Sequence, residues 1–101
     1  MNEAAVSDSF KALADPTRVR ILALLKQRGQ SCCGLIGKRE PGLCACDIQQ
    51  NVGLSQSVVN HHMQILIRAG LVTGEKRGRW VYYRRNDAAI AALADMLARA
   101  V

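Results

Sequence analysis

SQSVVNHHMQILIRAG, at residues 55–70, has the pattern of a single amphipathic helix. Ser55 can cap its start, because a serine hydroxyl accepts a hydrogen bond from a free backbone N–H of the first turn. Gly70 suits the position after its end, where the backbone becomes left-handed. The residues predicted to face the core recur at steps of three and four: Val58, Val59, His62, Met63, Leu66 and Ala69. We therefore predict one helix with a core-facing stripe.

The opposite face of this helix is rich in hydrogen-bonding side chains. It carries Gln56, Ser57, Asn60, His61, Gln64 and Arg68. Amides, hydroxyls and imidazoles both donate and accept hydrogen bonds, so they can recognise base edges in a DNA major groove. A solvated helix on a small domain has the same pattern. The neighbouring segments have to decide between the two interpretations.

The segment before this helix favours DNA recognition. Residues 44–52, CACDIQQNV, are typical of a short helix with Ile48 and Val52 facing inward, and Gly53-Leu54 forms a turn. A short helix, a turn containing glycine and a second helix with a polar outer face make a helix-turn-helix.

The segment after the helix concentrates positive charge. Residues 71–86, LVTGEKRGRWVYYRRN, predict a hairpin with strands at 71–73 and 80–84 and a basic turn. Residues 68–85 hold six basic residues and one acid, which is a net charge of +5 out of +6 for the whole chain. This charge lies next to the polar helix, as a nucleic-acid partner requires. Arg77 and Arg79 are the expected wing contacts to phosphate or the minor groove.

Three more helices complete the pattern. Residues 3–14 form a short alanine-rich helix, and Asp15-Pro16-Thr17 starts a second that supplies much of the core. Residues 87–100, which Asp87 can cap, form a nearly uncharged last helix. The fold is therefore mainly α with a small β-hairpin, in the order helix, helix, short helix, polar helix, two strands, helix. This is a winged helix-turn-helix.

Composition limits the location and the chemistry. The 101 residues are enough for one domain with one core, at residues 1–101. No apolar run reaches about eighteen residues, and the N-terminus has no signal-peptide pattern, so we expect a cytoplasmic protein without a membrane span. Thiols stay reduced in the cytoplasm, which makes the four cysteines ligands or sensors rather than disulfide partners.

The cysteines lie on both sides of a predicted boundary. Cys32 and Cys33 fall in a loop at residues 29–43, GQSCCGLIGKREPGL, whereas Cys44 and Cys46 open the short helix. A loop this long in so small a domain is usually functional or disordered, and its cysteines favour a functional loop. Ten residues separate Cys33 from Cys44, enough for the loop to fold back.

Three stretches together resemble one family, the ArsR/SmtB metal-sensing repressors. They are FKALADPTRVRILALL, LSQSVVNHHMQILIRAGLV and GRWVYYR, and the resemblance spans roughly residues 8–98. It implies a homodimer joined through the first and last helices, which binds a palindromic operator in double-stranded DNA and is released by a metal or metalloid. The segment GLCACD at 42–47 resembles ELCVCD of the arsenic and cadmium/lead sensors, where the two cysteines supply thiolate ligands.

This chain departs from that pattern in places that bear on the ligand. The arsenic repressors of the best-known kind have a third cysteine where this chain has Gln49, and the loop before the motif is longer than usual. The last helix lacks the histidine and carboxylate set of the zinc sensors. As(III) and Sb(III) are soft, three-coordinate centres that prefer thiolates. We therefore expect Cys44 and Cys46 to bind arsenite or antimonite together with one or both of Cys32 and Cys33.

Other interpretations stay open at this point. A repressor of the same fold could sense thiol oxidation or persulfides, or bind Cd(II), Pb(II) or Zn(II) through four sulfurs. The cysteines could also be buried packing residues. A metal-buffering or thiol enzyme domain is less favoured, because no acid/base pair or oriented histidine accompanies the cysteines. We expect a regulator and not an enzyme.

Overall fold

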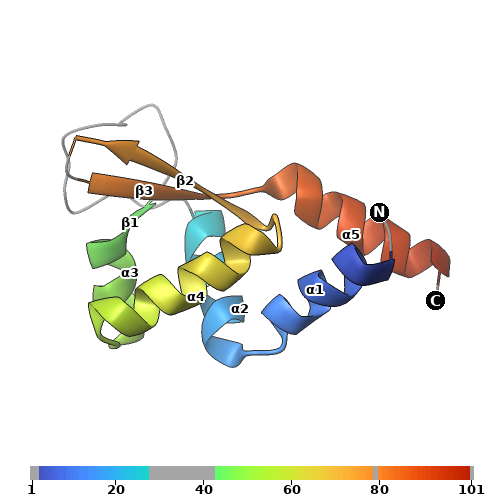
Figure 1. Ribbon diagram of the computed structural model, residues 1–101, viewed down its shortest axis with the longest axis horizontal. Coiled ribbons are helices and arrows are strands. Elements are labelled where there is room, and N and C mark those ends of the chain that lie inside the picture. The colour runs from blue at the N-terminus through green and yellow to red at the C-terminus, as the bar shows by residue number, and fades with distance from the viewer. Residues whose placement is uncertain (1–2, 28–42, 79, 101) are drawn as a thin grey trace.

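The computed structural model describes residues 3–27, 43–78 and 80–100 (Figure 1). Its elements in chain order are α1 (Glu3–Leu13), α2 (Pro16–Gln27), β1 (Leu43–Cys44), α3 (Ala45–Val52), α4 (Gln56–Arg68), β2 (Val72–Arg77), β3 (Trp80–Arg85) and α5 (Asp87–Ala100). The predicted order of helices and hairpin is confirmed, and β1 is an addition that the sequence did not reveal. The predicted strand at 71–73 was too short, because residues 74–77, assigned to the turn, pair with β3 and belong to β2.

The helix α4 runs through the core. Val59, Met63 and Leu66 are completely buried along one of its faces. The assignment of Val58 to this face was wrong, since its side chain is 41% exposed. Successive residues of a helix are about 100° apart, so Val58 projects to one side of the buried row. Other buried side chains come from every remaining helix and from the sheet, among them Ile21 of α2, Ile48 of α3, Val72 of β2 and Leu93 of α5.

Local capping explains where the helices begin and end. The Oδ1 atom of Asp15 accepts a hydrogen bond from the N–H of Thr17 at 2.8 Å, which starts α2 as expected. Ser55 Oγ accepts from the N–H of Val58 at 3.3 Å, and Gly70 has the predicted positive φ of 76°. At α5 the cap is Asn86 instead of Asp87, because Asn86 Oδ1 accepts from the N–H of Ala89 at 3.1 Å.

Arg18 joins α4 to the corner between α1 and α2. Its Nε donates to the carbonyl of Ala12 at 2.7 Å, and its Nη1 lies 3.2 Å from His62 Nδ1. His62 is half-buried. This contact gives His62 a role in holding α4 in place, in keeping with its predicted position on the packing side.

The sheet holds the start of α3 against the wing. Its strand order is β1-β3-β2, and both pairings are antiparallel. In the pair of β1 with β3, Leu43 lies opposite Tyr83 and Cys44 lies opposite Tyr82. Cys44 therefore occupies the junction between a strand and a helix, which restricts its backbone from both sides.

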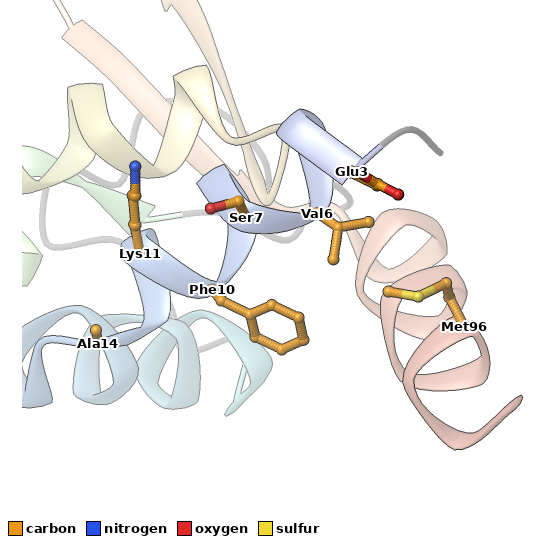
Figure 2. Close-up of a pocket in the computed structure, with 7 residues that line it drawn as sticks. All are labelled: Glu3, Val6, Ser7, Phe10, Lys11, Ala14 and Met96. Atoms are coloured by element: carbon orange, nitrogen blue, oxygen red, sulfur yellow. The ribbon is translucent and has the colours of Figure 1, made fainter. Parts of the chain in front are cut away.

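The first and last helices form a groove at the other end of the molecule. Figure 2 shows Val6 and Phe10 of α1 and Met96 of α5 pointing into the same space. The groove encloses about 590 Å³ and is mostly apolar. Phe10 is 38% exposed, and Leu97 of α5 is 40% exposed. Within the part of the chain that the structure describes, no helix is long and apolar enough to cross a membrane.

Candidate functional site

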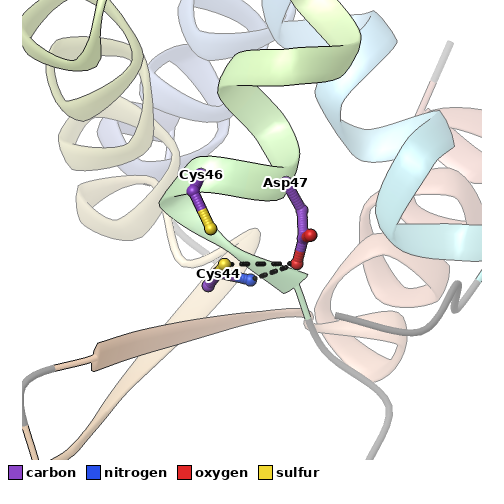
Figure 3. Close-up of side chains that lie close together, drawn as sticks. All are labelled: Cys44, Cys46 and Asp47. Carbon is purple, nitrogen blue, oxygen red and sulfur yellow. Dashed lines mark hydrogen bonds between the residues drawn. The ribbon is translucent and has the colours of Figure 1, made fainter. Parts of the chain in front are cut away.

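Two cysteines and an aspartate converge at the first turn of α3 (Figure 3). The Sγ atoms of Cys44 and Cys46 and a carboxylate oxygen of Asp47 all lie within 4.8 Å of one another. Cys44 is 1% exposed, Asp47 is 5% exposed, and Cys46 is half-buried. The structure thus brings together two of the predicted ligands and adds a carboxylate.

Asp47 fixes the position of Cys44. Its Oδ2 atom accepts hydrogen bonds from the backbone N–H of Cys44 at 3.1 Å and from Cys44 Sγ at 3.2 Å. A side chain at the third helical position that reaches back to the capping residue closes the helix N-terminus, where a negative charge is also favourable. The sequence contained this signal, an acid three residues after Cys44, but the prediction of ligands considered cysteines alone.

The geometry suits a thiophilic ion. Two sulfurs that share one ion at about 2.3 Å each can be at most about 4.6 Å apart. The separation of up to 4.8 Å is therefore within reach of a small side-chain rotation. Thiolates are the ligands that soft centres prefer, and an adjacent carboxylate suits borderline ions such as Zn(II). The predicted partners Cys32 and Cys33 lie outside the described residues, so a third sulfur stays a prediction.

The polar face of α4 is exposed as expected. Gln56, Ser57, His61 and Gln64 are exposed, and Asn60 is half-buried. Arg77 is the last residue of β2, and Arg79 lies outside the described residues. The assignment of these residues to DNA contacts stays a prediction.

A pocket connects the cysteines to this polar face. It encloses about 400 Å³ between α3, α4 and β3. Its lining residues are Cys44, Ala45, Cys46, Gln49, Gln56, Asn60, Gln64, Val81 and Tyr83. Burial raises the pKa of the Tyr83 phenol, which keeps its hydroxyl protonated. Sequence reasoning missed this pocket, because it depends on how α3, α4 and the sheet pack together.

Known proteins match this chain in sequence. A family model described as a helix-turn-helix domain matches residues 13–75. An uncharacterized HTH-type transcriptional regulator of Bacillus subtilis, YbzH, is 36% identical over 87% of this chain and 90% of its own length. The arsenical resistance operon repressor of the same organism is 38% identical over 77% of this chain, which spans 63% of that repressor. A cadmium resistance regulatory protein, a CadC homolog of Staphylococcus aureus, is 31% identical over 93% of this chain and 68% of its own length.

Solved structures agree with this result. An ArsR-like transcriptional regulator from Rhodococcus is 29% identical, covers 95% of this chain and 78% of its own, and has a TM-score of 0.73. The homodimeric winged helix-turn-helix domain of a possible ArsR-family regulator from Mycobacterium bovis has a TM-score of 0.71 at 24% identity, over 96% of this chain and 79% of its own. At that identity the second match supports the fold alone.

Proposed function

This chain belongs to the ArsR/SmtB family of winged helix-turn-helix transcriptional regulators, and we propose that it is a repressor released from its operator by arsenite or antimonite. The observation that carries this proposal is the convergence of Cys44, Cys46 and Asp47 at the start of α3. A regulator of this kind acts on chromosomal DNA, so we place it in the cytoplasm and assign it no enzymatic activity.

The position of the site explains how a ligand could act on DNA binding. The cysteines open the first helix of the helix-turn-helix, and only residues 53–55 separate that helix from α4. Recognition helices of a dimer must lie about 34 Å apart to enter successive major grooves. A small rotation of α3 that α4 follows would spoil this spacing. A coupling of about 1–3 kcal/mol is typical of such systems and lowers DNA affinity about 5- to 150-fold.

A repressor that senses Cd(II), Pb(II) or Zn(II) is the second candidate. Asp47 favours it, because a carboxylate oxygen close to two sulfurs is a ligand that Zn(II) accepts more readily than As(III) does. The similarity to the cadmium regulator of Staphylococcus aureus agrees with it. In the first candidate one or both of Cys32 and Cys33 complete the site, and in the second candidate both do.

A direct test uses a duplex selected by the protein from a random-sequence library. Arsenite should lower the affinity for this duplex about 5- to 150-fold, measured by fluorescence anisotropy at fixed salt. Release by Cd(II) but not by arsenite would establish the second candidate. Release by peroxide or polysulfide alone would show that the cysteines sense oxidation. Full binding under all of these conditions would contradict ligand sensing altogether.

We assign DNA recognition to two groups of residues with different roles. On α4 these are Gln56, Ser57, Asn60, His61 and Gln64, and on the wing they are Arg77 and Arg79. The α4 group is exposed or half-exposed and carries hydrogen-bonding groups of the kind that read bases. Arg77 and Arg79 carry positive charge on the wing, and we expect them to contact phosphates or the minor groove.

These roles predict different consequences for substitutions. Arg77→Ala and Arg79→Ala should weaken binding to selected and random duplexes alike, and each should reduce the slope of log K against log salt by about 1. Asn60→Ala should weaken binding to the selected duplex by about 1–3 kcal/mol while leaving binding to random DNA nearly unchanged. Lys26→Ala removes an exposed charge from α2 and serves as the control. Equal losses of Asn60→Ala on both duplexes would contradict base reading by α4.

A further inference from the structure

The pocket beside the cysteines has two walls with different proposed roles. Cys44 and Cys46 belong to one wall, at the start of α3. Gln56, Asn60 and Gln64 belong to the other, where their spacing of four residues forms a single row along α4. The groups proposed to bind the inducer and the groups proposed to read bases therefore share one space of about 400 Å³.

DNA and the inducer would compete for the amide groups of this row. Each amide has two donors and two acceptor positions in one plane, so the rotamer that directs it toward a base edge differs from the one that directs it into the pocket. Ser57 and His61 lie on the polar face of α4 as well, but they do not line the pocket. The row at Gln56, Asn60 and Gln64 is thus the part of α4 that can contact either DNA or a ligand in the pocket.

The chemistry of arsenite makes this conflict concrete. When As(OH)3 reacts with two thiols, two As–S bonds form, two As–O bonds break, and two water molecules leave without any change of oxidation state. One hydroxyl stays on arsenic until a third thiol replaces it and releases a third water. Amide groups in the pocket can hydrogen-bond this hydroxyl. Tyr83 also lines this pocket.

We propose that operator DNA and the inducer exclude each other directly at this pocket. DNA on α4 covers the pocket beside Cys46, and an inducer held by Cys44 and Cys46 takes the amides of Asn60 and Gln64 away from DNA. This proposal rests on the proposed function and adds a direct competition to any movement of α3. A purely conformational mechanism does not need DNA to cover Cys46, and it does not need the amides of α4 to contact the inducer.

Alkylation of Cys46 tests the first half of the proposal. The full chain is reduced, freed of reductant and treated with N-ethylmaleimide, with or without saturating selected duplex, and modification of each cysteine is followed by peptide mass spectrometry. Operator DNA should slow the modification of Cys46 at least about tenfold, whereas a random duplex at a salt concentration that prevents its binding should have no effect. Anisotropy of the same samples reports whether the DNA is bound.

The two possible failures are distinguishable in this experiment. An unchanged alkylation rate at Cys46 with the operator demonstrably bound would overturn the direct competition and leave the proposed function intact. A protein that binds no selected duplex would overturn the proposed function itself.

The amide row is tested by arsenite binding without DNA. Gln64→Met keeps the size of the side chain and removes its hydrogen-bonding groups, so arsenite affinity measured by calorimetry should fall about two- to twelvefold. Gln50→Met is the matched control, because Gln50 undergoes the same change at an exposed position of α3 that does not line the pocket. It should leave arsenite affinity unchanged. Arsenite affinity of Gln64→Met equal to that of wild type would overturn the shared role of the amides.

Discussion

Cys46→Ser should keep the protein on its operator at arsenite concentrations that release the wild type. The substitution replaces a thiolate that binds As(III) strongly with a hydroxyl that does not. The wild-type loss of DNA affinity of about 5- to 150-fold should therefore shrink to less than about twofold. Anisotropy titrations of the selected duplex with and without arsenite measure both numbers in one experiment.

Cys44→Ser provides a second, independent version of this result. Cys44 is almost completely buried, so its replacement also tests the fold. Serine is slightly smaller than cysteine, and its hydroxyl can still donate to Asp47 as Cys44 Sγ does. Both variants should bind the operator normally in the absence of arsenite and unfold at temperatures close to that of the wild type. Arsenite release as complete as in wild type from a variant that lacks both Cys44 and Cys46 would contradict their role as ligands.

The hydrogen bonds of Asp47 suggest why ligand binding should be felt outside the site. Cys44 Sγ donates to Asp47 Oδ2, which also accepts a hydrogen bond from the backbone N–H of Cys44, the residue that precedes the first turn of α3. A thiolate bound to an ion has no proton to donate, so this contact must change when the ligand arrives. The change occurs at the N-terminus of α3, and α3 packs against α4 through buried residues such as Ile48. Such a path links the ligand to the recognition helix with few intermediate steps.

Local signals made most of the fold predictable. The serine and glycine at the ends of α4, the Asp15 start of α2 and the basic hairpin all depend on residues close together in the chain. The structure contains all of them, although the first strand of the hairpin is longer than predicted. The prediction that Val58 faces the core was wrong at a position next to the buried face of α4. Val58 is apolar and adjoins the buried row, so a count of apolar spacings includes it, although its orientation leaves it exposed.

The site was less predictable because its parts are distant in sequence. The strand β1 has only two residues, too short for any recognisable alternation, and it exists because Leu43 and Cys44 pair with a strand forty residues away. The pocket that joins Cys46 to Gln64 requires α3, α4 and β3 at once. The sequence could name cysteines and amides as candidates, but only packing shows that they line one space.

Phe10→Asp should convert a dimer into monomers. We propose, from the family resemblance and from the apolar groove between α1 and α5, that two copies of the chain associate through these helices. Removing the Phe10 ring should weaken association by about 1–2 kcal/mol per protomer. Only the 38% of this side chain that is exposed in the monomer becomes buried when two copies associate. An unpaired carboxylate in an apolar contact costs at least as much again. A two-fold interface contains each residue twice, so the total is at least about 4 kcal/mol, or about a thousandfold in Kd.

Sedimentation equilibrium over a range of concentrations measures this change, with thermal unfolding to show that the monomer is folded. Gln50→Asp adds the same charge to an exposed position of α3, outside the groove, and should leave association unchanged. Binding to the selected duplex should fall together with dimerisation, because a single recognition helix reads only one half-site. If Phe10→Asp stayed dimeric at the concentrations where the wild type does, the α1–α5 groove would be excluded as the interface. A monomer that kept full operator affinity would instead show that the protein reads its site without a partner subunit.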